Sequence, residues 1–470
     1  MNKIGKSKTF LFREIKYSDK ESVLISIKFI YSNIFFLFFA LNLLLLLNLI
    51  SCNTTEPPII PPPPPDLRKI TLTFEDASCT EVWLRVKADS ITLPVEIKLM
   101  QETTQQNITL TVKDSVIYID SLNPNQTYVY QAVLNKDTTI KSEKITAQTL
   151  EPTSHNFTWQ SWEFGQHSSS VLYDVAIIDE NNIWAVDEIY MNDSLGNPDP
   201  TLYNIIKWYG VQWKVERVYY NYQGSNFIAP LFSIIALTAT DIWVGSNQPM
   251  HLINNKWEKW DLLSDIWNGW INKIWGTSKN DLYIVGNGGE IAHYNNTTWT
   301  KIESGTTLNI YDIWGDINPN TNEYEIIALA SDHTSGKGTK LLRINGTNVE
   351  NISTEGLPLS MDAIWFRSLR KYYAVGDGFY STQILGNQWL KNNSIPKYHK
   401  TTISSTNLNN IFLGGAYGLF MHFNGVEWNN YQFNVVSYND FFSSIDLKSN
   451  LVCAVGANMN NKAIIYLDVK

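Results

Sequence analysis

Three tryptophans with polar neighbours are the first residues in this chain that could do chemistry. The group consists of Trp260, Trp267 and Trp270, flanked by Asp261, Asp265 and Asn268. Flat aromatic rings stack on the C–H faces of sugars, while carboxylates and amides bond to the hydroxyl groups. The three tryptophans are therefore our candidate ligand-binding residues. The alternative interpretation is that a long connection between strands buries its own tryptophans.

The histidines do not predict a metal site. His251, His293 and His422 each stand six residues before a tryptophan. They therefore occupy one equivalent position in three separate repeats, whereas a metal needs ligands that converge. We expect a structural role for them between neighbouring repeats, and we expect no metal and no other cofactor.

Carboxylates could support glycoside hydrolysis if two of them met in space, which spacing along the chain does not reveal. No nucleophile, acid and base stand in a recognisable pattern, so we name no catalytic residue. The expected function is binding or scaffolding without catalysis. The alternative is a carbohydrate-active enzyme, either a glycoside hydrolase or a lyase.

These residues belong to a repeating region from 155 to 470, with a period of about 40 residues. One unit, from Ile271 to Gly305, reads as four short strands joined by Gly, Asn and Ser turns. The second strand recurs seven times, but the turn before the fourth strand recurs only six times. The segment Phe157 to Trp162 precedes the first unit and would supply the missing strand. The pattern predicts a seven-bladed β-propeller that is closed by its N-terminal strand.

The innermost strands of a propeller line its channel. The position ten residues before the second-strand aromatic residue should therefore face that channel. In five repeats this position holds Asp174, Ser233, Lys273, Ala363 and Thr402. The set predicts no ring of like charge.

The repeat IWGTSKNDLYIVGNGGEIAHYNNTTW resembles the units of secreted bacterial propeller proteins, which are similar to sialidase-type and photosystem-assembly-factor-type propellers. The Ser-x-Asp-x-Gly boxes of sialidases are absent. The resemblance therefore implies the architecture and no particular reaction.

Residues 67–150 alternate apolar and polar side chains in short segments, which predicts a β-sandwich. Leu122, Pro124 and Tyr128 resemble the turn and tyrosine corner of fibronectin type III domains. The resemblance implies that the Tyr128 hydroxyl bonds back to the turn and that the domain is a spacer or adhesion module. The whole chain is thus expected to be all-β.

The first 51 residues have a signal peptide's layout, with basic residues before an uncharged run from 34 to 50. The sequence Leu-Ile-Ser-Cys52 that follows resembles the lipobox of bacterial lipoproteins. The resemblance implies cleavage after residue 51 and a diacylglycerol on Cys52. The alternative is an uncleaved transmembrane anchor. Residues 52–66 are rich in proline and predict a stiff tether.

Location and partners follow from these features. Asn53 follows the cysteine, where an aspartate would signal inner-membrane retention, so we expect an outer-membrane lipoprotein on either face. The formal net charge of −9 disfavours nucleic acid. We expect a monomer that is held to the membrane by its lipid and binds a glycan or an envelope protein. Cys79 and Cys453 fall in different domains, so no disulfide is expected.

The lipid anchor can be tested by replacing its acceptor thiol. Cys52→Ser should abolish incorporation of labelled fatty acid and should move the protein from the detergent phase to the aqueous phase of a phase-separating detergent. Unchanged partition would instead indicate a transmembrane anchor.

Overall fold

The computed structural model describes residues 66–102, 104–222, 224–253, 255–333, 338–433 and 440–468. The signal segment, Cys52 and the tether up to residue 65 lie outside these ranges. Regular structure within them consists of strands and one short 3₁₀ turn, η1 (Asn287–Gly289), so the all-β prediction is confirmed. In the described ranges we find no helix with the length and apolarity needed to cross a membrane.

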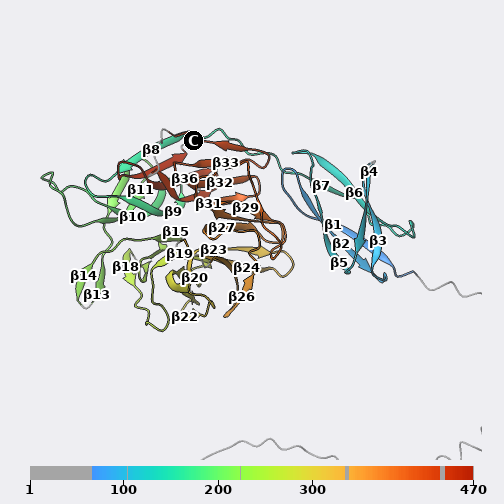
Figure 1. Ribbon diagram of the computed structural model, residues 1–470, viewed down its shortest axis with the longest axis horizontal. Helices are drawn as coiled ribbons and strands as arrows, with labels where there is room; N and C mark the ends of the chain where they lie inside the picture. The colour runs from blue at the N-terminus through green and yellow to red at the C-terminus, as the bar shows by residue number, and fades with distance from the viewer. Residues whose placement is uncertain are drawn as a thin grey trace, which may run out of the picture. The chain divides into compact units, whose positions relative to one another are not determined.

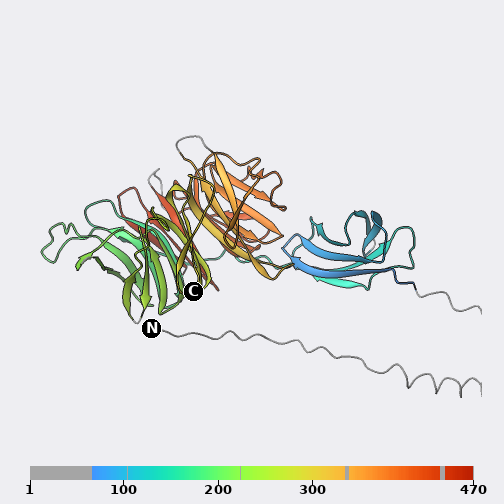
Figure 2. The same cartoon turned by 90° about the horizontal axis from the view of Figure 1, so that it is seen from below.

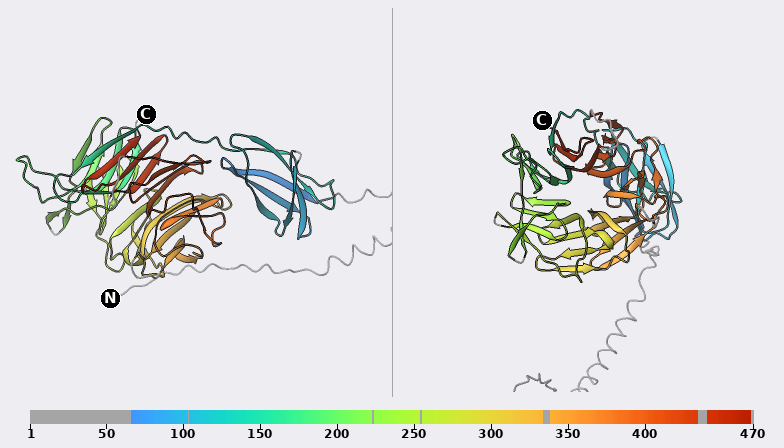
Figure 3. Two further views of the ribbon diagram at one scale, coloured as in Figure 1. Left: turned by 45° about the horizontal axis from the view of Figure 1, so that its top comes forward. Right: turned by 60° about the vertical axis from the view of Figure 1, so that its left-hand side comes forward.

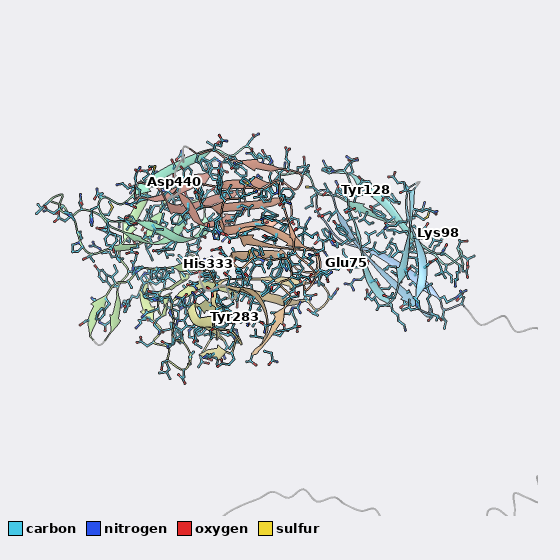
Figure 4. The ribbon with its side chains drawn as sticks, in the orientation of Figure 1. Glu75, Lys98, Tyr128, Tyr283, His333 and Asp440 are labelled. Carbon is cyan, nitrogen blue, oxygen red and sulfur yellow. The ribbon has the colours of Figure 1, made fainter. Side chains whose placement is uncertain are left out.

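The N-terminal domain is built from two antiparallel sheets. One has the order β1 (Lys69–Ala77), β2 (Val82–Asp89) and β5 (Asp114–Ile119). The other has the order β4 (Thr104–Leu110), β3 (Val95–Gln101), β6 (Thr127–Leu134) and β7 (Ile145–Gln148). Alternate residues of both sheets, such as Leu84 and Leu99, share one core, as expected for sheets that pack face to face (Figure 2). The backbone N–H of Asn123 donates to the Tyr128 hydroxyl at 2.8 Å, which confirms the hydrogen bond expected at this turn (Figure 4).

The described residues after 155 contain seven four-stranded antiparallel sheets, numbered here in chain order (Figure 1). Sheet 1 consists of β9 (Val171–Asp179), β10 (Asn182–Ile189), β11 (Tyr203–Trp208) and β12 (Trp213–Glu216). Sheet 2 consists of β15 (Ser233–Thr238), β16 (Asp241–Gly245), β17 (Pro249–Ile253) and β18 (Lys256–Lys259). Sheet 3 consists of β19 (Ile271–Ser278), β20 (Asp281–Gly286), β21 (Ile291–Tyr294) and β22 (Trp299–Ile302). Between sheets 1 and 2, β13 (Tyr220–Tyr222) and β14 (Ser225–Phe227) form a separate hairpin.

The second half of the region repeats the arrangement. Sheet 4 consists of β23 (Asn309–Asn318), β24 (Glu323–Ser331), β25 (Thr339–Asn345) and β26 (Asn348–Ile352). Sheet 5 consists of β27 (Met361–Arg367), β28 (Lys371–Gly376), β29 (Gly378–Thr382) and β30 (Leu390–Lys391). Sheet 6 consists of β31 (Lys400–Asn407), β32 (Asn410–Gly415), β33 (Phe420–Phe423) and β34 (Trp428–Asn430). Sheet 7 consists of β35 (Phe441–Lys448), β36 (Leu451–Ala457), β37 (Ala463–Asp468) and β8 (Trp159–Phe164).

The sheets are arranged around a central axis, as the right-hand view of Figure 3 shows. The inner strand of each sheet packs against the inner strand of the next, and β35 packs against β9, so the series returns to its start. Hydrophobic cores lie between successive sheets. The core between sheets 7 and 1, for example, joins Val455 and Ile465 to Ile183 and Ile206. Four-stranded sheets in this arrangement form a β-propeller.

The segment before the first repeat completes the last sheet, as the repeat count predicts. Strand β8 pairs antiparallel with β37 over six residue pairs, from Ala463 with Phe164 to Asp468 with Trp159 (Figure 1). The Trp162 ring of β8 also contacts the rings of Trp208 and Trp213 in sheet 1, at centroid distances of 5.5 and 6.0 Å. This strand therefore joins the two ends of the propeller through backbone pairing and side-chain packing.

Deletion of residues 155–165 should expose the edge of β37 and half of the core between sheets 7 and 1. We expect the free energy of unfolding to fall by about 3 kcal/mol, the size of effect that loss of a packed element causes. Chemical denaturation would measure this change. A synthetic peptide of residues 155–165 should restore part of the lost stability and a scrambled peptide should not. A deletion variant that is as stable as the parent would contradict the closure.

Candidate functional site

The inner edge of each sheet needs hydrogen-bond partners, because successive inner strands are not paired with each other as one sheet. Side chains of the inner strands supply these partners. Asp174 Oδ2 accepts from the Ile234 N–H at 3.1 Å, and Ser233 Oγ accepts from the Ile274 N–H at 2.9 Å. These contacts link sheet 1 to sheet 2 and sheet 2 to sheet 3.

The same type of link recurs elsewhere in the ring. Asp312 Oδ2 accepts from the Ile364 N–H at 2.9 Å, between sheets 4 and 5. Asp446 Oδ2 accepts from the Ile177 N–H at 2.6 Å, between sheets 7 and 1. Asp312 and Asp446 therefore accept structural hydrogen bonds between sheets and also line the channel.

A register shift occurs near the start of six inner strands and leaves one residue of each unpaired with the second strand. In sheet 2 the equivalent residue is Phe232, which directly precedes β15 and whose N–H donates to Gly245 O at 2.8 Å. Going round the ring, the residues at this position are Tyr173, Phe232, Asn272, Tyr311, Asp362, Thr401 and Ser443. Such bulges re-aim side chains and are frequent beside functional sites. All seven residues line one cavity of about 480 Å³.

Three of these seven residues have a structural task. Asn272 Nδ2 donates to Ile310 O in the next sheet at 2.9 Å. Thr401 Oγ1 donates to Phe442 O, and Ser443 Oγ donates to Leu172 O, in each case also in the next sheet. Within the described part of the chain, Tyr173, Phe232, Tyr311 and Asp362 make no such hydrogen bond to the next inner strand.

Two of the four form an aromatic surface at the end of the channel where the inner strands begin. We call this end the channel mouth. The Tyr173 and Phe232 rings lie 4.9 Å apart between centroids. Trp270 extends this surface, with its ring 5.4 Å from that of Phe232 in an edge-on geometry. The side chain of Trp270 is 45% exposed, so the aromatic surface is open to solvent.

The opposite side of the mouth is charged. His399 Nε2 lies 2.7 Å from Asp362 Oδ2, and its Nδ1 lies 2.7 Å from Asp377 Oδ1. These partners, first the hydrogen bond with Asp362, raise the pKa of His399 to about 9, so the imidazole is a cation at neutral pH. The Tyr311 ring stacks on His333, labelled in Figure 4, at a centroid distance of 4.6 Å.

The channel below the mouth contains an ion pair. Lys273 Nζ lies 3.0 Å from each carboxylate oxygen of Asp174, and Ser444 Oγ donates to Asp174 at 2.6 Å. Burial lowers the pKa of Lys273, but the carboxylates of Asp174, Asp312 and Asp446 outweigh it and raise the pKa overall. Four of the five residues that the sequence placed at the channel line the cavity, namely Asp174, Lys273, Ala363 and Thr402. Ser233 does not line it, but its hydroxyl donates to Asp174 Oδ2 at 3.0 Å. The contact between Asp174 and Lys273 was not predicted.

Two further carboxyl groups have unusual acidity. Burial raises the pKa of Asp312 and of Asp446 to about 6 in each case, and Lys273 offsets only part of this effect. Each carboxylate accepts two backbone N–H groups, its own neighbour's and one from the next sheet. Their lone pairs are thus largely committed to structure, which does not suit a catalytic acid or nucleophile that must reach a substrate. In the described residues, no group of three or more His, Cys, Asp or Glu side chains is arranged to hold a metal ion.

The three candidate tryptophans do not form one surface. Trp267 is 2% exposed and packs in the core between sheets 2 and 3, where its Nε1 donates to Gly269 O. Trp260 is partly buried against the same core. Burial leaves Trp267 almost no surface that a ligand could contact in this structure. Trp270 alone reaches the channel mouth.

The repeated histidines share contacts within their own sheets, and His422 also contacts the segment before β8, where its Nδ1 lies 2.8 Å from His155 Nδ1 and its ring 5.1 Å from that of Phe157. His251 stacks on Trp243 at 3.9 Å and its Nε2 contacts Asp241 at 2.8 Å, both on the neighbouring strand β16. His293 and His422 make the equivalent contacts in sheets 3 and 6. The cause is register, because the third-strand histidine lies directly opposite the second-strand aromatic residue.

Comparison with known proteins yields structural likeness only. No protein-family model and no curated protein matches the chain. A structure of YCF48 bound to a D1 peptide is 12% identical, with a TM-score of 0.49, and the match covers 68% of this chain and 97% of that one. YCF48 from Cyanidioschyzon merolae is 12% identical, with a TM-score of 0.47 over 66% and 98% of the two chains. The WD40 β-propeller domain of Doa1 is 11% identical, with a TM-score of 0.46 over 66% and 97%. The propeller assignment rests on the strand pairing described above.

The acidity of Asp312 should appear in the pH dependence of stability. Its folded-state pKa of about 6 lies above the ordinary value of 3.8, so protonation favours folding, and this stabilisation is lost as the pH rises through 6. The free energy of unfolding of the protein relative to Asp312→Asn should therefore fall by about 1 kcal/mol between about pH 5 and pH 7.5.

Urea denaturation at the two pH values measures this difference. Thr401→Val is the control, because it removes a hydroxyl link between sheets but no titratable group, so its effect should be the same at both values. A constant difference for Asp312→Asn would show that Asp312 does not titrate in this window.

Proposed function

We propose that this chain is a lipid-anchored binding protein of the bacterial envelope, without catalytic activity, whose ligand enters the channel mouth of a closed seven-bladed propeller. One observation carries the proposal. At the bulged position of the inner strands, Tyr173, Phe232 and Tyr311 place aromatic rings at a cavity of about 480 Å³ instead of linking their sheet to the next. A concave site with aromatic walls and a few polar groups is typical of ligand recognition.

The rest of the chain fits a presentation role. The lipobox-like sequence at Cys52 supports a membrane anchor, and the prolines that follow it support a spacer. The two-sheet domain with its Tyr128 corner supports a fibronectin type III-like module between tether and propeller. We propose the outer membrane as the location, on the basis of Asn53.

Binding is favoured over turnover because of how the channel carboxylates are used. Asp174, Asp312 and Asp446 each accept backbone N–H groups from the next sheet. Moving one of them to attack or protonate a substrate would break the contact between two sheets. A binding site has no such requirement, since its groups act in place.

The double variant Tyr173→Leu, Phe232→Leu tests the location of the site. Loss of both rings should weaken binding of a glycan or peptide ligand about tenfold or more, because each aromatic contact contributes about 1 kcal/mol. Tyr219→Leu is the matched control, since Tyr219 is 43% exposed and does not line the cavity. Ligands would come from a glycan array and a peptide library, with the Tm of each variant recorded.

Two outcomes would contradict the proposal. Unchanged affinity in the double variant would remove the site from the channel mouth. Release of products from any glycan of the array would favour the carbohydrate-active enzyme instead.

A further inference from the structure

The charges that line the cavity do not balance. Four carboxylates line it, those of Asp174, Asp312, Asp362 and Asp446. Lys273 is held between the two oxygens of Asp174, and the only other lysine of the lining, Lys448, is the last residue of β35 and lies at the opposite end of the strand from the mouth. Near the mouth, the His399 cation is shared by Asp362 and Asp377, and His333 Nε2 lies 3.7 Å from Asp362 Oδ1.

The carboxylate of Asp312 lies next to an aromatic residue of the channel mouth. Asp312 follows Tyr311 in β23, and Tyr311 occupies the bulged position at the mouth. Across the cavity lie Tyr173 and Phe232, at the same level of the ring. An aromatic face attracts a cation, and a carboxylate beyond it adds an ion pair.

We propose that the channel mouth selects a cationic side chain, that of an arginine or lysine in a peptide segment of the ligand. The proposal rests on the proposed function and names its ligand class. The aliphatic part of the side chain packs between the rings of Tyr173, Phe232 and Tyr311, while its charged end reaches the layer of Asp312 and Asp446. Arginine suits this site best, because its planar guanidinium stacks on rings and pairs with carboxylates.

Charge complementarity favours this ligand over a neutral glycan. A sugar would satisfy the rings but would leave the charges of Asp312 and Asp446 offset only in part, by Lys273. An acidic ligand would be repelled by the same groups.

The acidity of the channel supports a coupling between binding and proton release. The pKa values of Asp312 and Asp446 near 6 reflect burial with too little positive charge nearby. A ligand cation would favour their ionised forms, so the affinity should rise as the pH increases from about 5 to 7.5. The charge of His399 does not change over this range, because its pKa is about 9, and neighbouring carboxylates raise the pKa of Lys273 above its ordinary value.

The test compares two peptides that differ only in charge. The probes are acetyl-Gly-Ser-Arg-Ser-Gly-amide and the same peptide with citrulline, a neutral analogue, in place of arginine. Ligand-observed NMR titrations against the whole purified protein would give both affinities. We expect the arginine peptide to bind about tenfold more tightly, because one charge is paired in a site of lowered dielectric. The preference should increase between about pH 5 and pH 7.5 and should decrease with added salt.

Variants identify the carboxylates responsible. Asp312→Asn combined with Asp446→Asn should remove most of the preference for arginine over citrulline. Asp316→Asn is the matched control, because Asp316 lies in the same strand and also accepts an N–H from the next sheet, that of Ser368 at 2.8 Å, but does not line the cavity. This control should keep the full preference.

Three results would overturn the inference. They are equal affinity for the two peptides, no detectable binding of either, or a preference that survives in the double asparagine variant. Should that variant not fold, the comparison of the two peptides on the parent protein at both pH values still decides. Neutral glycan binding that depends on Tyr173 and Phe232, without any preference for arginine, would leave the proposed function intact and reject the cationic ligand.

Discussion

The structure depends on how the inner edges of the sheets are satisfied. Each sheet ends at the channel with backbone groups that no neighbouring strand pairs, and each covers its two faces only by packing against the sheets on either side. Side-chain acceptors such as Asp174 and Ser233 solve the first problem locally. The second has only a global solution, which is a closed ring, because an open series would expose the cores at its two ends. Strand β8, from the start of the repeat region, pairs with β37 in the last sheet.

The way in which the sheets are linked also explains where a ligand can bind. All seven residues at the start of the inner strands line the cavity, but some of them also link two sheets and others do not. Asn272, Thr401 and Ser443 link their sheet to the next, whereas Tyr173, Phe232 and Tyr311 leave their rings at the cavity. Some sheets can lack a side-chain link at this position because the links at the other sheets still hold the repeats together. The aromatic residues therefore gather in sheets 1, 2 and 4, and the mouth is asymmetric although the fold is repetitive.

The repeat pattern predicts much of this fold because counting strands requires only local signals. The pairing of β8 with β37 follows from a missing fourth strand, and Tyr128 follows from its turn. The site is harder to predict, because a bulge shifts the register by one residue and sends Tyr311, not only Asp312, to the cavity. The signal that could have revealed these cavity residues was an aromatic residue one position before the expected channel position, as at Tyr173 and Phe232. The burial of Trp267 could not be predicted either, because it lies in a connection between strands, where the sequence has no repeating pattern.

The choice of aspartate at two links points to function. Serine performs the same task at position 233, where its hydroxyl accepts an N–H from the next sheet without carrying a charge. Asp312 and Asp446 instead carry carboxylates whose pKa burial raises to about 6, so their ionisation at neutral pH costs free energy. A local conflict of this kind is expected where function sets the residue. The cost is offset if a ligand brings a positive charge to the channel, because the same burial that makes the lone carboxylate unfavourable strengthens its attraction to a cation.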